Sequence, residues 1–320
     1  MIFLTVLAAL STIGSLAPLL KSDYWLIRGQ DYFKHIYLIL NTSLLVFFIM
    51  RGAFDVMGTI CILGLVASVI YCARAILPFT PIYNKQVLSS PVEKSNLRLY
   101  IFNVYQYNEN HKQVLQGLKN SGADIIFLSE INSEWRDGLD DLFDLYPYSS
   151  SKLKENTYGL LVLSKYQIES SEIHYLVRKD VPSLELMINF NGERIKLWMI
   201  HPKPPVPGEL EYAGPKDAEV EAVAEKINKA VFEGPVILAG DLNDVAWSPA
   251  TLKFVKKTAL FDPRRGRGFY PTFPSWSPLK IPIDQVLLSK HFRVSKMSCS
   301  DAMGSDHHPF IIDLEFVGRQ

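Results

Sequence analysis

The sequence predicts a layered α/β (α+β) sandwich preceded by membrane-spanning helices. The first 80 residues contain only five Lys/Arg and three Asp/Glu, whereas residues 81–320 contain 28 Lys/Arg and 30 Asp/Glu. Beyond residue 97, apolar runs of strand length alternate with longer helical patterns. Hairpin signals such as Asn191-Gly192 interrupt that alternation. The mixture of hairpins and helices favours mixed sheets covered by helices over a purely parallel sheet.

Three uncharged runs, at residues 2–20, 36–50 and 56–72, predict about three transmembrane helices. The alternative is a signal peptide followed by two buried helices. A signal peptide would require basic residues before its apolar run, and none precedes Ile2. The first run is also long enough to cross a bilayer by itself.

The basic residues around the runs predict the orientation. Lys21, Arg28 and Lys34 follow the first run, while Arg51 alone follows the second. The positive-inside bias therefore places the first loop, and everything after Pro78, in the cytoplasm. A re-entrant first pair of helices would reverse this.

A proline-bearing stretch separates the apolar quarter from the rest of the chain. Pro81 and Pro91 disfavour helix and strand interiors and suit a tether. We therefore expect a membrane anchor at residues 1–80, a linker at 81–96 and a catalytic domain at 97–320.

The remaining elements follow from periodicity and turn residues. Strands are predicted at residues 99–104, 124–129, 159–164, 184–190, 195–200, 236–239, 283–289 and 309–316, and helices at 111–120, 133–143, 216–232 and 249–258.

Polar residues that packing does not require stand at the ends of these strands. They are Asn103, Glu130, His201, Asp241, Asn243, Asp284, Asp306 and His307. Singly, most could cap a turn or face solvent. Asp284 is harder to explain, because an unpaired carboxylate in an apolar strand costs several kcal/mol. It needs a partner, and a histidine is a natural one.

Taken in order, these motifs resemble those of the endonuclease/exonuclease/phosphatase (DNase I-like) superfamily. The matching segments are Asn103, Leu-Ser-Glu130, His201, Gly-Asp241-Leu-Asn243, Ile-Asp284-Gln and Ser-Asp306-His307-His-Pro. The apolar N-terminus further resembles a membrane-anchored bacterial branch, which implies an integral protein of the bacterial inner (plasma) membrane. The resemblance implies a four-layer sandwich, with two mixed β-sheets flanked by helices.

The resemblance also implies hydrolysis of phosphate esters with Mg²⁺, or with Mn²⁺. Asn103, Glu130 and Asp306 match the positions near the metal, and their oxygens suit a hard cation. Asp241 matches the residue that orients or deprotonates water, with Asn243 beside it. His307 and its partner Asp284, together with His201, match the groups that contact the phosphate.

Two features modify this expectation. Tyr105 stands where abasic-site endonucleases have an acid, which argues against a DNA-repair role. Arg264, Arg265 and Arg267 could grip substrate phosphate, or could form a solvated basic loop.

The substrate class stays open between nucleic acid and a lipid headgroup. The net charge of about −2 beyond residue 80 supplies no basic field for nucleic acid. A catalytically silent interaction module on the same fold is the alternative function. Three cysteines make no disulfide framework, and we predict no protein partner.

Overall fold

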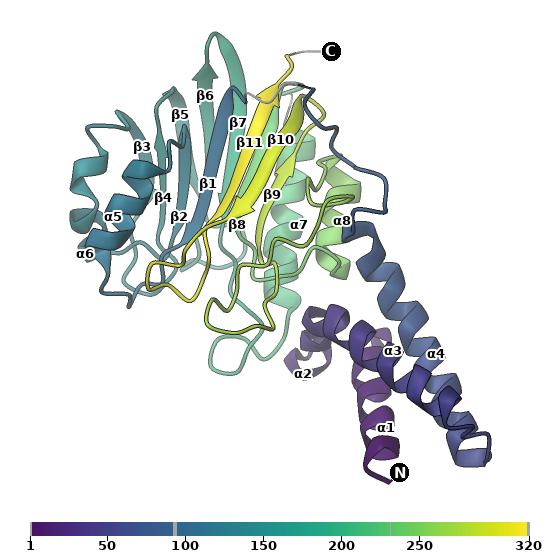
Figure 1. Ribbon diagram of the computed structural model, residues 1–320. Helices are drawn as coiled ribbons and strands as arrows, with labels where there is room; N and C mark the ends of the chain where they lie inside the picture. Colours follow the sequence, from purple (N-terminus) through teal and green to yellow (C-terminus); the bar gives the residue numbers. More distant parts are fainter. Residues whose placement is uncertain (1, 92–94, 231, 319–320) are drawn as a thin grey trace.

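Two mixed β-sheets packed face to face form the centre of the computed structural model, which describes residues 2–91, 95–230 and 232–318 (Figure 1). The six-stranded sheet has the order β10-β11-β1-β2-β4-β3, and the five-stranded sheet has the order β5-β6-β7-β8-β9. The strands are β1 (Leu97–Asn103), β2 (Ile125–Ser129), β3 (Tyr148–Lys152), β4 (Leu160–Ser164), β5 (Gln167–His174), β6 (Ser183–Phe190), β7 (Glu193–Ile200), β8 (Val236–Asp241), β9 (Asp284–Leu288), β10 (Phe292–Cys299) and β11 (Phe310–Phe316). The pairs β1–β2 and β7–β8 are parallel, and the other pairs are antiparallel.

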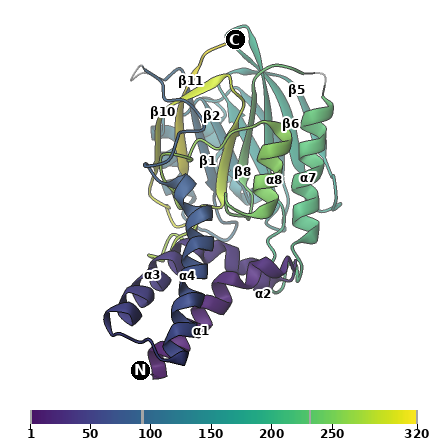
Figure 2. The ribbon, with the colours of Figure 1, turned by 90° about the vertical axis from the view of Figure 1, so that its right-hand side faces the viewer.

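Helices cover both outer faces and complete the four predicted layers. The helices α5 (His111–Asn120) and α6 (Ser133–Gly138), with the 3₁₀ turn η4 (Asp140–Leu142), pack on the six-stranded sheet. The helices α7 (Gly214–Lys229) and α8 (Pro249–Thr258) pack on the other sheet (Figure 2). Between the sheets, alternate residues of each strand, such as Leu184, Leu186 and Ile188 of β6, form the main core. The fold class is therefore confirmed.

The N-terminal bundle, residues 2–79, lies beside one end of the sandwich (Figure 1). Its elements are α1 (Ile2–Leu16), η1 (Ala17–Leu20), α2 (Trp25–Arg28), η2 (Gly29–Phe33), α3 (Lys34–Met50), α4 (Val56–Ile76) and η3 (Leu77–Phe79). Three stretches, Ile2–Leu20, Trp25–Met50 and Val56–Phe79, are long and apolar enough to cross a membrane. Inside the bundle, Ser68 Oγ lies 2.6 Å from Ser15 Oγ and accepts a hydrogen bond from Asn41 Nδ2 at 2.5 Å. This contact joins the three stretches in an otherwise apolar setting.

Three strands, β3, β5 and β10, were not predicted from the sequence. Each is an edge strand of its sheet. The strands β3 and β5 are mostly exposed, so their residues carry little hydrophobic periodicity. In β10 a bulge between Val294 and Lys296 interrupts the alternation of its core residues. The sequence Gln-Ile-Glu-Ser-Ser-Glu-Ile-His of β5 is mostly exposed. The predicted helix at 133–143 is in fact the short α6 followed by η4.

The chain between the bundle and β1 packs against the sandwich. Val87 is buried in the main core, and Ser90 N donates to Val294 O at 2.8 Å. Val294 N in turn donates to Leu88 O at 2.9 Å. This segment therefore covers part of the exposed edge of β10.

Gly240, directly before Asp241 in β8, allows a close approach of two strands. Its φ is +140°, and an added Cβ would lie 2.2 Å from the carbonyl oxygen of Ile200. We expect Gly240→Ala to lower the free energy of unfolding by roughly 3 kcal/mol, through backbone strain and steric overlap together. Chemical denaturation of the full chain in detergent measures this.

Gly192→Ala is the matched control. Gly192 has φ +92° but open space around its Cβ position, so that variant carries backbone strain alone, about 1 kcal/mol. Equal losses in the two variants would contradict the close approach at Gly240.

Candidate active site

The pairing of the strands brings the predicted polar residues to one edge of the sandwich. Asn103 and Ser129 are register partners at the ends of β1 and β2, so Glu130 emerges beside Asn103. Asp241 and Asp284 are register partners in β8 and β9. The β11 strand begins beside the end of β1, which carries the preceding residues Asp306 and His307 to the same edge.

His307 lies between two buried carboxylates. Its Nδ1 is 2.7 Å from Asp284 Oδ2, and its Nε2 is 3.6 Å from Asp241 Oδ2. The same Asp241 oxygen lies 3.6 Å from His201 Nε2. Asp241 therefore stands between two imidazoles, while its other oxygen accepts the Asn243 N–H at 2.8 Å.

The charges around His307 decide its protonation. Burial by itself lowers the pKa of His307, but the charges of Asp284 and Asp241 outweigh it and raise the pKa to about 10. Burial raises the pKa of Asp284, against the opposing charge of His307. In this arrangement the imidazole carries the proton at neutral pH and can donate a hydrogen bond.

Asn103 and Glu130 form a second group at this edge. Asn103 Nδ2 donates to Glu130 Oε1 at 2.9 Å and to Asp241 Oδ2 at 3.1 Å. Glu130 Oε2 accepts the Gln106 N–H at 2.9 Å. Glu130 has φ +66°, a conformation that few non-glycine residues adopt. Asn103 thus orients two carboxylates, with its Oδ1 accepting from Tyr105 N at 3.0 Å.

The acidic groups of the pocket fit a divalent cation. Asp306 Oδ1 is buried and has no hydrogen-bond partner among the described residues. Burial raises the pKa of Asp306, and the charges of Glu130 and Asp241 add to this against that of His307. Carboxylates that repel one another around an unsatisfied oxygen are a donor set suited to Mg²⁺ or Mn²⁺.

Asp241, Asp284 and His307 also lie within metal-binding distance of one another. However, the hydrogen bond to Asp284 already occupies His307 Nδ1. We therefore interpret these three residues as a proton-holding network and not as the cation site.

A cavity of about 280 Å³ lies over these groups. Its lining includes seven of the predicted residues, namely Asn103, Glu130, His201, Asp241, Asn243, Asp306 and His307. Asp284 lies behind His307, at 1% exposure. Two aromatic walls were not predicted: Tyr158 is 5.4 Å from the His201 ring and Phe273 is 4.9 Å from the His307 ring, centroid to centroid.

Ser305 was also not singled out. It donates through Oγ to Asn103 O at 2.7 Å and accepts the His307 N–H at 3.0 Å. It therefore ties the segment that carries His307 to the end of β1. The sequence feature that could have identified Ser305 is its position two residues before His307.

The structure places the three predicted arginines away from this cavity. Arg264 is 1% exposed and pairs with Asp262 at 2.7 Å, behind β9. Arg267 donates to Val87 O at 2.8 Å, and Arg265 lies 5.9 Å from the Phe79 ring. Arg264 neither grips substrate phosphate nor belongs to a solvated basic loop, because its hydrogen-bonding groups are engaged inside the protein.

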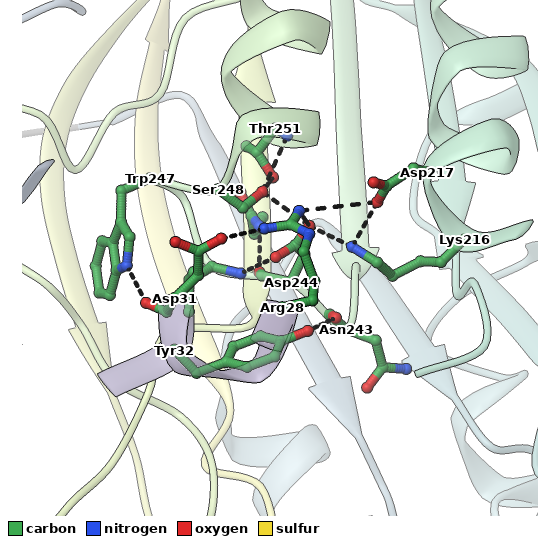
Figure 3. Close-up of polar contacts among 12 residues, drawn as sticks. Arg28, Asp31, Tyr32, Lys216, Asp217, Asn243, Asp244, Trp247, Ser248 and Thr251 are labelled. Carbon is green, nitrogen blue, oxygen red and sulfur yellow. Dashed lines mark hydrogen bonds and ion pairs between the residues drawn. The ribbon is translucent and has the colours of Figure 1, made fainter. Parts of the chain in front are cut away.

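The N-terminal bundle reaches the same edge through buried ion pairs (Figure 3). Arg28 pairs with Asp31 and, at 3.3 Å, with Asp244, which also pairs with Lys216 of α7. Arg28, Asp31, Lys216 and Asp244 are each at most 7% exposed. Asp31 further pairs with Lys34 at 2.6 Å, and Lys216 with Asp217 at 3.1 Å. The network therefore contains three cations and three anions.

Two neutral hydrogen bonds accompany these pairs. Tyr32 Oη donates to Asn243 O at 2.7 Å, and Trp247 Nε1 donates to Asp31 O at 2.7 Å (Figure 3). Asn243 and Asp244 directly follow the segment that carries Asp241. The bundle thus holds the loop at the end of β8 in place.

A model of the Endonuclease/Exonuclease/phosphatase family matches residues 101–307 of the sequence. That span includes all the predicted site residues. A search of curated protein sequences found no match.

Solved structures share the fold of the sandwich. A humanized TDP2 of D. rerio carrying 14 mutations matches with a TM-score of 0.57 and 18% identity, over 68% of this chain and 98% of that one. An endonuclease/exonuclease/phosphatase from Beutenbergia cavernae matches with a TM-score of 0.56 and 16% identity, over 70% of this chain and 72% of that one. A beta toxin of Staphylococcus aureus matches with a TM-score of 0.50 and 17% identity, over 68% of this chain and 99% of that one.

The ion network predicts that Arg28 stabilises the folded protein. Arg28→Met leaves the buried carboxylates with one cation fewer, which costs about 3–5 kcal/mol. We expect the thermal midpoint of the full chain in detergent to fall by roughly 10 °C. Arg51→Met, at an exposed turn between α3 and α4, is the control. An equal midpoint for Arg28→Met and the unchanged protein would contradict the stabilising role of the network.

Proposed function

Since the chain belongs to the Endonuclease/Exonuclease/phosphatase family, we propose that it is a divalent-cation-dependent phosphoesterase anchored in a membrane. The family is generally hydrolytic on phosphoester bonds. The site would lie at the edge of the sandwich next to the N-terminal bundle. The substrate is an anionic phosphate ester, which repels hydroxide and must be neutralised before water can attack.

The observation that carries this proposal is the placement of His307 between Asp284 and Asp241, at the base of a pocket rich in carboxylates. Asp284 holds the imidazole through Nδ1 and so fixes its orientation. This leaves Nε2 to face Asp241 and the pocket. A protonated imidazole at this place can donate to a phosphoryl oxygen and offset its charge.

Asp241 is placed to act on water. Asn103 donates to its Oδ2 and the Asn243 N–H donates to its Oδ1, so both oxygens are fixed. A carboxylate held in this way can orient a water molecule and accept its proton. His201, 3.6 Å from the same Oδ2, offers a second donor beside His307.

Glu130 and Asp306 would hold the cation, with Asn103 beside them. When bound, Mg²⁺ or Mn²⁺ neutralises phosphate oxygens and lowers the pKa of coordinated water. Asn103 would contribute mainly by orienting Glu130, because its amide oxygen accepts from the Tyr105 backbone.

The apolar stretches of the bundle support membrane association. The first loop contacts the sandwich, since Trp25 N donates to Glu211 O at 2.9 Å and Ala213 N to Asp23 O at 2.7 Å. With three crossings, that loop and the sandwich would share one side of the membrane. We propose the cytoplasmic side of a bacterial inner membrane, from the basic residues of the loop.

His307→Ala should lower kcat by about 10²–10⁴-fold, because it removes a donor from the developing phosphate charge. The measurement is hydrolysis of a p-nitrophenyl phosphodiester and monoester by the full chain in detergent with Mg²⁺. His308→Ala is a matched control: the His308 ring contacts Lys280 and the Ser300 carbonyl. Full activity in a folded His307→Ala protein would refute the assignment. Failure of the unchanged protein to hydrolyse either ester would favour the interaction module.

Glu130→Gln should raise the Mg²⁺ concentration needed for half-maximal hydrolysis about tenfold or more, because it removes a charged ligand. EDTA should abolish the activity of the unchanged protein, and Mg²⁺ or Mn²⁺ should restore it. Glu134→Gln, at an exposed position of α6, controls for the loss of one acid. An unchanged cation requirement in Glu130→Gln would exclude Glu130 as a ligand.

A further inference from the structure

An apolar cavity of about 250 Å³ adjoins the catalytic pocket. The two share five lining residues, Pro204, Val206, Asn243, Phe273 and Ile283. The two cavities therefore border one another, so an apolar cavity lies directly beside the pocket that contains His307.

The walls of this apolar cavity come from both halves of the chain. The N-terminal bundle contributes Trp25, Gly29, Tyr32 and Phe33, and the sandwich contributes the remaining residues, among them Pro205 and Ile281. Its lining residues include no Asp, Glu, Lys or Arg. Tyr32 Oη is engaged with Asn243 O. The cavity therefore offers hydrocarbon surface to a ligand and few polar partners.

The cavity lies at the junction between the apolar bundle and the sandwich. Trp25 and Phe33 belong to the stretch Trp25–Met50, which is long and apolar enough to span a membrane. Phe33 is 42% exposed and Val206, on the opposite wall, is 41% exposed.

We propose that this cavity binds the hydrocarbon chain of a membrane-resident phosphate ester whose phosphate lies in the catalytic pocket. The inference rests on the proposed function and specifies its substrate class as an amphiphilic lipid phosphate. The bundle is then part of the substrate site as well as an anchor. Each methylene that leaves water for such a cavity adds roughly fourfold in affinity.

The charges of the site favour this substrate over nucleic acid. The catalytic pocket includes the carboxylates of Glu130, Glu209, Asp241 and Asp306 in its lining. A cation would offset them at the reacting phosphate, whereas a nucleic acid carries a phosphate at every neighbouring nucleotide. Arg264 and Arg267 are engaged elsewhere, and none of the three predicted arginines lines the pocket.

Gly29 offers a substitution that fills the cavity. Its φ is −62°, an ordinary helical value, and an added Cβ would meet no atom within 4 Å. Gly29→Leu therefore adds a side chain to the cavity wall without backbone strain. Thr59→Leu, on the exposed side of α4, adds a comparable side chain far along the bundle and is the control.

The test compares two p-nitrophenyl phosphodiesters that differ only in the second ester group, one hexadecyl and one ethyl. The full chain is assayed in dodecyl maltoside micelles with Mg²⁺, and the ratio of kcat/KM for the two esters is measured. Because the hexadecyl ester partitions equally into the micelles for every variant, changes in the ratio report on the protein. We expect Gly29→Leu to lower the hexadecyl-to-ethyl ratio about tenfold while ethyl hydrolysis stays within about twofold. Thr59→Leu should leave both unchanged.

An unchanged ratio in Gly29→Leu, or an equal loss for both esters, would overturn the chain-binding role while leaving the phosphoesterase proposal intact. If neither ester is hydrolysed, the proposed function fails. The chain-binding role of the cavity is then tested separately, by a binding measurement. A bromohexadecyl phosphonate bound in the cavity should quench the fluorescence of Trp25. This part of the quenching should be absent in both Trp25→Phe and Gly29→Leu. Quenching that Gly29→Leu leaves intact would overturn the inference.

Discussion

The buried carboxylate of Asp284 is the constraint on which the edge of the sandwich depends. At 1% exposure it can remain charged only beside a cation, and His307 supplies one at 2.7 Å. That pairing requires the segment before β11 to reach the start of β9, near the end of β1. Ser305 fixes this approach by bonding both Asn103 O and His307 N. The same geometry that satisfies a buried charge therefore aims an imidazole into the pocket.

The N-terminal bundle is attached to that edge by charges as well as by the chain. Arg28 reaches Asp244, and Tyr32 reaches the backbone of Asn243, next to the segment that carries Asp241. Buried ion pairs are costly to form but costlier to break one partner at a time, so they fix one relative position of the two parts. A fragment beginning near residue 96 would lack these contacts. The bundle and the proposed catalytic residues are thus parts of one structure.

Local patterns in the sequence determined the main architecture. The uncharged runs gave the helices of the bundle, and apolar alternation gave the interior strands, because burial imposes a periodicity on neighbouring residues. The polar residues at strand ends stood out for the same reason, since packing did not require them. Asp284 was identified as needing a histidine, and the order of the motifs indicated the family. Seven of the eight strand-end residues line one pocket, and the eighth is the partner of His307.

What the tertiary structure alone decided involves residues far apart in the chain. The exposed edge strands β3 and β5 carry no apolar burial pattern, so only their pairing reveals them. Arg264 looked available in a Gly-rich stretch, but Asp262 and Gln285 engage it inside the fold. The ion pair between Arg28 and Asp244 joins residues 216 positions apart, and no local pattern encodes a contact at that separation. Sequence periodicity reports which residues are buried, whereas their partners are set by how the layers pack.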